Sequence, residues 1–150
     1  MTAVDDRPAS EVGTARKRKE DARLITGRTK WTDNIQLPGM LHLAMVRSPF
    51  AHATIDAIDT SAAAASPGVI AVFTGADLAD SQGVNINAWP IAPDQVTPTH
   101  LPVAVERVAC AGEIVAVVAA RSAAAARDAV ELVDVEWGEL AAVLDLKEAA

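Results

Sequence analysis

The chain has 150 residues, of which 51% are apolar and 3% aromatic, and its formal net charge is −7. This length is typical of one domain that buries roughly 68–70% of the surface of its unfolded chain. An excess of negative charge argues against nucleic acid or an anionic membrane as a partner. The single cysteine, Cys110, excludes an internal disulfide and a cysteine-based zinc site.

Met1 is not followed by an apolar signal segment. No apolar run approaches the ~20 residues that a membrane-spanning helix needs. The sequence therefore predicts a soluble, cytoplasmic protein without membrane insertion.

The charge is unevenly distributed along the chain. Residues 1–15 lack hydrophobic periodicity and predict a mobile tail, which leaves 16–150 as the folded domain. Residues 16–19 (RKRK), with Arg23 and Arg28, form a basic cluster ahead of an acidic body. Two interpretations stay open: a docking arm for an acidic partner, or a solvated segment, which is the more ordinary origin of such a run.

Apolar runs separated by turn signals predict a series of short elements. Residues 40–46 predict a strand in which Leu41, Leu43 and Met45 share one face, and Pro49 ends it. A strand, a short helix and a further strand follow, at 53–58, 61–65 and 69–73.

Residues 74–101 are irregular, and a segment of that length without structure is uncommon unless it is functional or covered by a partner. A strand at 103–109 follows, and then the unit that organises the chain. There, 114–119 predicts a strand buried on both faces, Ser122 caps a helix, and 133–137 alternates as a half-exposed strand. This order suggests a right-handed crossover between parallel strands.

Few side chains suggest chemistry. His42, His52 and His100 do not stand at metal-ligand spacing, so structural roles are favoured for all three. Cys110 has no neighbouring His or Lys and is interpreted as a small core residue rather than a nucleophile.

The acidic and hydroxyl side chains have structural explanations as well. Asp134 and Glu136 alternate on one strand face, which is more typical of solvent-facing residues than of a catalytic pair. Ser48, Ser66 and Ser122 stand at turns or caps. No glycine-rich phosphate loop is present. The residues alone predict an α+β or α/β domain with no catalytic, cofactor-binding or metal-binding residues.

Many short segments, in chain order, are similar to one family of domains. They are RKED (18–21), Leu24, Thr26-Gly27, Thr32-Asp33, LPGMLH (37–42), VRSP (46–49), AHA (51–53), Ile58-Asp59, PGV (67–69), TGADL (74–78), Gly112-Glu113, Val115-Ala116 and VEW (135–137). Together they resemble the N-terminal α/β hammerhead domain of molybdenum hydroxylase large subunits. That family includes xanthine dehydrogenase, aldehyde oxidase and aerobic carbon monoxide dehydrogenase. The similarity covers residues 16–150.

The resemblance implies an α+β fold with a mixed sheet, strand–helix–strand units and two main helices packed on it. It also implies an oxidoreductase that uses molybdopterin and passes electrons to iron–sulfur and flavin subunits. The family's pterin-binding loops and catalytic glutamate lie in domains beyond the hammerhead, so no residue of this chain is assigned to cofactor or catalysis. We therefore expect a structural and assembly domain that is inactive alone.

The resemblance further suggests that the basic cluster, residues 74–101 and the apolar C-terminal residues rest on the missing domains or on a partner subunit. The alternatives are an autonomous binding module that reuses the fold, or a truncated product without a function. An intrinsic small enzyme is the least favoured of these, because no nucleophile–base pair is evident.

Overall fold

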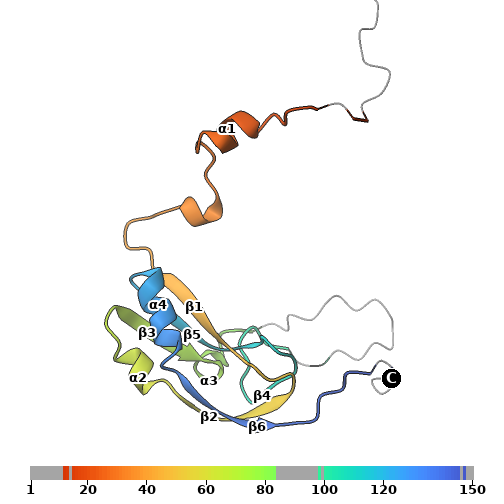
Figure 1. Cartoon of the computed structure of the whole chain (residues 1–150). Coiled ribbons are helices and arrows are strands. Elements are labelled where there is room, and N and C mark those ends of the chain that lie inside the picture. Colours follow the sequence, from red (N-terminus) through yellow and green to blue (C-terminus); the bar gives the residue numbers. More distant parts are fainter. Residues whose placement is uncertain (1–11, 14, 84–97, 99, 146, 148–150) are drawn as a thin grey trace, which may run out of the picture. The chain divides into compact units, whose positions relative to one another are not determined.

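The structure, a computed structural model, describes residues 12, 13, 15–83, 98, 100–145 and 147 (Figure 1). The chain divides into two units, residues 1–38 and 39–150, which are treated separately below. The predicted tail at 1–15 falls largely outside the described residues, as do 84–97 and 99 within the predicted irregular segment.

The first unit contains two short helical elements, α1 (Asp21–Ile25) and the 3-10 turn η1 (Thr32–Asn34). Arg18 ties down the start of α1, because its backbone amide and its Nε each donate to the Asp21 carboxylate at 2.9 Å. Neither element contains a buried residue. Local hydrogen bonds, rather than a hydrophobic core, therefore stabilise these two helical elements.

The second unit contains two three-stranded sheets. The first has the order β1 (His42–Arg47), β5 (Ile114–Ala120), β3 (Val69–Thr74). The second has the order β4 (Arg107–Val108), β2 (Ala53–Asp59), β6 (Asp134–Glu139). These elements confirm the α+β class.

The predicted crossover between parallel strands is wrong. All four strand pairings among the described residues are antiparallel, and β5 and β6 belong to different sheets. The reason is that β1 and β3 already occupy both edges of β5, so the chain leaving β5 pairs with β2 instead. Hydrophobic periodicity predicts where a strand lies, but it does not specify which strand is its neighbour.

The helix after β5 is as predicted. α4 (Ala123–Val130) begins at Ser122, whose Oγ accepts a hydrogen bond from the Ala125 amide at 3.1 Å. Ala126 and Ala129 are fully buried, and α4 packs against the first sheet (Figure 1). Their small side chains let the helix lie close to the strands. Of the two predicted main helices, the other is a single turn, α2 (Ser61–Ala64), which also contacts α4.

β5 carries much of the buried core, as its apolar run predicts. Val115 and Val118 are among the largest fully buried side chains. Val118 packs with Ala63 and Ala129 beneath α2 and α4, whereas Val115 belongs to a second cluster with Val108. β5 is buried along most of its length, as predicted, but Ile114 and Val117 are only half-buried.

The predicted strand at 103–109 is much shorter in the structure, where only β4 is formed.

The short helix α3 (Gly75–Leu78) starts at a capping box formed by Thr74 and Asp77. Thr74 Oγ1 accepts a hydrogen bond from the Asp77 amide at 3.3 Å, and the Asp77 carboxylate accepts one from the Thr74 amide at 2.8 Å. The Thr74 hydroxyl also donates to the Asp77 carboxylate, at 2.7 Å. The bonds that this carboxylate accepts from the Thr74 backbone amide and, secondarily, from the Thr74 hydroxyl hold the pKa of Asp77 below its usual 3.8.

Candidate functional site

The three histidines lie on separate elements. His42 is a half-buried residue of β1. His52 Nδ1 lies 2.9 Å from the Ala141 carbonyl oxygen, a bond that holds the segment after β6. His100 Nε2 lies 3.4 Å from Glu113 Oε1. These contacts give His52 and His100 structural partners, in line with the roles predicted from sequence.

Glu113 is a polar centre that sequence reasoning missed. Its side chain is only 7% exposed, and its Oε2 accepts a hydrogen bond from the Ala109 amide at 2.7 Å. Cys110 Sγ lies 3.9 Å from the same oxygen. Glu113 therefore stabilises the turn between β4 and β5 through one carboxylate oxygen and contacts His100 through the other.

The prediction that Cys110 is a core residue is wrong. Its side chain is exposed, because the strand predicted around it ends at Val108 and Cys110 lies in the turn that follows. The cysteine lines an open hollow of about 370 Å³ together with His52. Its neighbour is a carboxylate rather than a cation, an environment that does not activate a thiol.

The remaining polar candidates take the structural positions predicted for them. Asp134 and Glu136 occupy the exposed positions of β6. Ser48 Oγ accepts from the Phe50 amide at 3.0 Å and donates to the Phe50 carbonyl at 2.9 Å, which closes a turn. Ser66 accepts the Val69 amide through its carbonyl at a turn. Within the part of the chain that the structure describes, no group of three or more His, Cys, Asp or Glu side chains is placed to hold a metal ion.

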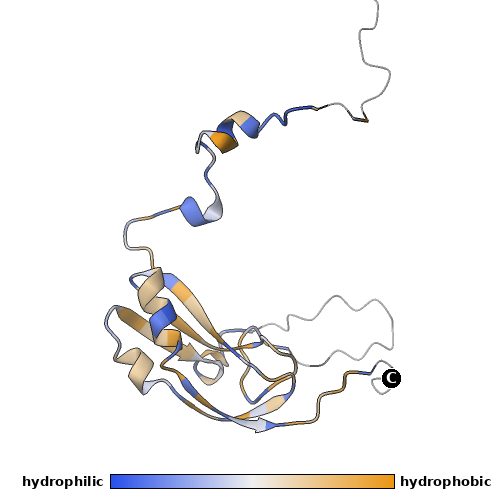
Figure 2. Ribbon diagram, in the orientation of Figure 1, coloured by the Kyte–Doolittle hydropathy of each residue, from blue (hydrophilic) through white to orange (hydrophobic). Residues whose placement is uncertain are grey.

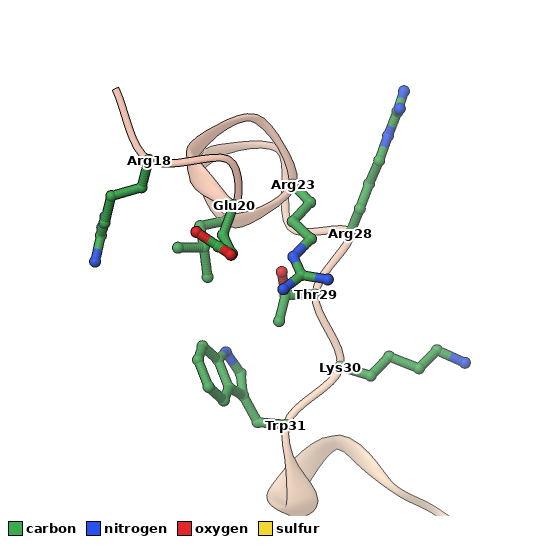
Figure 3. Close-up of a pocket in the computed structure, with 8 residues that line it drawn as sticks. Arg18, Glu20, Arg23, Arg28, Thr29, Lys30 and Trp31 are labelled. Atoms are coloured by element: carbon green, nitrogen blue, oxygen red, sulfur yellow. The ribbon is translucent and has the colours of Figure 1, made fainter. Parts of the chain in front are cut away.

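The first unit has a hollow of about 610 Å³ beside α1 (Figure 3). In Figure 3 the side chains of Arg23 and Thr29 extend toward the hollow, whereas Arg28 and Lys30 point away from it. Thr29 Oγ1 is buried and has no hydrogen-bond partner among the described atoms. The lining residues are Arg18, Glu20, Arg23, Leu24, Arg28, Thr29, Lys30 and Trp31.

The hollow and its surroundings present cations together with exposed apolar side chains. Residues 15–38 carry seven Lys and Arg against three Asp and Glu, and Ile25, Trp31 and Leu37 are mostly exposed. A surface of this kind suits an acidic partner with an apolar pocket better than a small metabolite. The docking-arm interpretation of the basic cluster stays a prediction.

Comparison with known proteins identifies the kind of domain. The family described as aldehyde oxidase and xanthine dehydrogenase, a/b hammerhead domain, matches residues 26–141. The nicotine 6-hydroxylase large subunit of Paenarthrobacter nicotinovorans is 45% identical over 134 residues, which are 89% of this chain and 16% of that protein. The carbon monoxide dehydrogenase large chain of Afipia carboxidovorans is 41% identical over 134 residues, with the same shares.

Solved structures agree with the sequence relatives. Quinoline 2-oxidoreductase from Pseudomonas putida 86 superposes with a TM-score of 0.80 at 46% identity, covering 91% of this chain and 17% of that one. The Cu,Mo-CO dehydrogenase in its carbon monoxide reduced state superposes with a TM-score of 0.76 at 39% identity, covering 91% of this chain and 16% of that one. This chain thus spans about one-sixth of the length of these four proteins. None of the helices in the described part is long and apolar enough to cross a membrane.

Proposed function

Because the chain belongs to the aldehyde oxidase and xanthine dehydrogenase a/b hammerhead domain family, we propose that it is the structural and assembly domain of a molybdopterin-dependent oxidoreductase. In this role the domain folds beside the parts of the enzyme that hold the cofactor and contributes surface rather than reacting groups. The observation that carries the proposal is the family match over residues 26–141 within proteins about six times as long.

The described residues do not offer a donor set that fits the cofactor's metal. They provide no group of three or more His, Cys, Asp or Glu side chains that could hold a metal ion. The carboxylate of Glu113, whose side chain is largely buried, is already bonded to the Ala109 amide and contacts His100. We therefore place molybdopterin on the remainder of the large subunit and assign no catalytic, cofactor-binding or metal-binding residue here. A relative of this chain is named the xanthine dehydrogenase molybdenum-binding subunit, of which the match covers 17%.

The partners that this role requires are the remaining molybdopterin-binding domains and the iron–sulfur and flavin subunits, in the cytoplasm. Support comes from relatives that are themselves named as subunits. One is named a large subunit, and another, 35% identical over 145 residues, is named subunit gamma of a 6-hydroxypseudooxynicotine dehydrogenase complex. The proposed domain is residues 16–150, preceded by a mobile tail at 1–15.

Affinity purification tests the role directly. The chain is tagged in its native host and purified gently, and the material is assayed for molybdenum and for co-purifying proteins. We expect molybdenum together with larger iron–sulfur and flavin polypeptides. A metal-free monomer would contradict the assembly role and favour an autonomous binding module.

A further inference from the structure

The first sheet has one face covered by helices and another that is apolar but exposed. Side chains of directly paired residues in antiparallel strands point to the same face. Val118 pairs with Ala44 of β1 and Val72 of β3, and this row faces α4 and α2. The neighbouring row, centred on Val117, therefore lies on the opposite face.

That opposite face is continuous across all three strands. Met45 and Phe73 pair with Val117 from either side, and Leu43 and Ala71 pair with Ala119 in the next row. We call this surface the open face; its exposed or half-buried members are Leu41, Leu43, Met45, Ala71, Phe73 and Val117. Ala119, which is paired between Leu43 and Ala71, is itself buried. In Figure 2 the three strands that carry this face, β1, β3 and β5, have largely hydrophobic colours.

The open face exposes large side chains to water. Leu43 is 64% exposed, Phe73 42% and Met45 41%. Single exposed apolar residues are ordinary on protein surfaces, but a row of them in register across three strands forms a contiguous patch. Such a patch marks a surface that another molecule or domain covers.

We propose that the open face is the docking surface for the remainder of the molybdenum hydroxylase large subunit, which covers it with an apolar surface of its own. This rests on the proposed function. A solved structure at 46% identity superposes on 91% of this chain with a TM-score of 0.80, and the matched region is 17% of that polypeptide. In that polypeptide the other five-sixths is covalently attached, and tethering raises its effective concentration to about the millimolar range. A tethered surface therefore reaches the open face ahead of a second copy of the domain.

Charge is consistent with that occupant. The members of the open face are uncharged, and the charge at its edge is Arg47, at the end of β1, whose Nη2 donates to Met45 Sδ at 3.4 Å. The second unit as a whole is acidic, which disfavours an anionic membrane as the occupant. An apolar face with a single charge at its edge is typical of the core of a permanent interface rather than of a transient one.

Cysteine accessibility tests the proposal in two contexts. In a Cys110→Ser background, Met45→Cys is placed on the open face. Leu132→Cys, a position of similar exposure (45%) after α4, is the matched control. Each variant is labelled with a thiol reagent in the full 150-residue chain. The measurement is then repeated in a quinoline 2-oxidoreductase large subunit whose matching segment is replaced by this chain.

We expect both cysteines to react rapidly in the isolated chain. In the chimera, labelling at Met45→Cys should slow by at least tenfold relative to Leu132→Cys. Equal labelling of the two positions in a folded chimera overturns the open-face proposal and leaves the assembly role standing. If the quinoline 2-oxidoreductase large subunit folds with its native segment but the chimera that carries this chain does not, the assembly role itself is overturned.

A second copy as occupant would give a different result. Labelling at Met45→Cys in the isolated chain would then slow as the chain concentration is raised, with a matching increase in sedimentation coefficient. That outcome also overturns the proposal, because the face would be covered without the remainder of the large subunit.

Discussion

At Gly75, the first residue of α3, a side chain would run into the backbone of the segment before β4. A Cβ built on this residue lies 2.6 Å from the Ala104 carbonyl carbon and closer still to its oxygen. Because the obstacle is backbone, it cannot rotate away as a flexible side chain would. The constraint comes from the approach of two segments almost thirty positions apart, and it was not evident from the TGADL motif alone.

We expect Gly75→Ala to lower the free energy of unfolding by about 1–3 kcal/mol, the usual cost of forcing extra volume into a packed site. Urea unfolding followed by circular dichroism measures the change. Ala76→Ser, which adds one heavy atom at the exposed next position of the same helix, is the control and should change stability little. Equal stability of the two variants would contradict the steric explanation.

Asp77 makes the stability of α3 depend on pH. The Thr74 amide and hydroxyl hold the pKa of Asp77 below 3.8 in the folded chain. The bonded carboxylate therefore stabilises the fold fully above the unfolded pKa, and this contribution is lost as the pH falls through the lower folded pKa. Because Asp77 is at the surface, solvent screening keeps the effect small.

We expect Asp77→Asn to be less stable than the parent chain at neutral pH, with the difference shrinking as the pH falls below 3.8. Urea midpoints across a pH series measure the convergence. Thr74→Ser keeps both donors and should retain the parent profile. A gap between Asp77→Asn and the parent that widens in acid would contradict the assigned cause.

Residue-scale prediction from sequence succeeded where the partner is local. Ser122 is predicted as a cap because the amide it bonds lies three residues away. The contact of His100 with Glu113 and the exposure of Cys110 were missed. Both depend on where β4 ends and on how the next turn brings Glu113 back against the preceding segment, and no spacing rule describes that.

At the scale of elements, β5 has two faces with different energetics. Val118 is fully buried beneath α4 and α2, and Val117, its neighbour in the strand, is half-buried on the open face. Because both residues are valines, the same substitution at the two positions compares the burial of the two faces of β5.

We expect Val118→Ala to lower the free energy of unfolding by about 2 kcal/mol, from lost burial plus the cavity left behind. Val117→Ala should cost less than half as much in the isolated chain, because water already reaches that face. Differential scanning calorimetry or urea unfolding gives both values. Equal costs would indicate that the open face is covered within the chain itself.

The positions of the elements were predicted better than their pairing. The strands β1, β2, β3, β5 and β6 and helix α4 lie where hydrophobic periodicity placed them. Their arrangement in two antiparallel sheets was not predicted, because an apolar run reports burial and not the identity of its neighbour. The strand at 103–109 was overestimated, since apolar residues such as Val103 and Ala104 are buried without strand pairing in the described chain.

At the scale of the whole molecule, the two units differ in what holds them together. α1 has five residues and none is buried, and so short a helix is marginal in water without tertiary packing. β5, in contrast, is paired on both edges and buried along most of its length. Binding by the first unit would therefore involve ordering as well as contact.

Hydrogen exchange followed by mass spectrometry tests this difference in the full chain. We expect α1 amides to exchange with protection factors below about 10, as frayed segments do, and β5 amides to be protected by at least about 10³. Peptides from β5 are the internal control. Protection of α1 comparable to that of β5 would mean that the first unit is already packed in the isolated chain.

The sequence by itself determined the domain family, the α+β class, the buried strand and the capped helix, because these depend on local periodicity, on neighbouring caps and on many short matches in order. Only the tertiary structure decided which strands pair, where Glu113 and Cys110 lie, and that Leu43, Met45 and Phe73 form one exposed face. These features arise when segments far apart in the chain meet. Strand pairing in particular depends on which strands occupy the two edges of β5, and hydrophobic periodicity does not specify that.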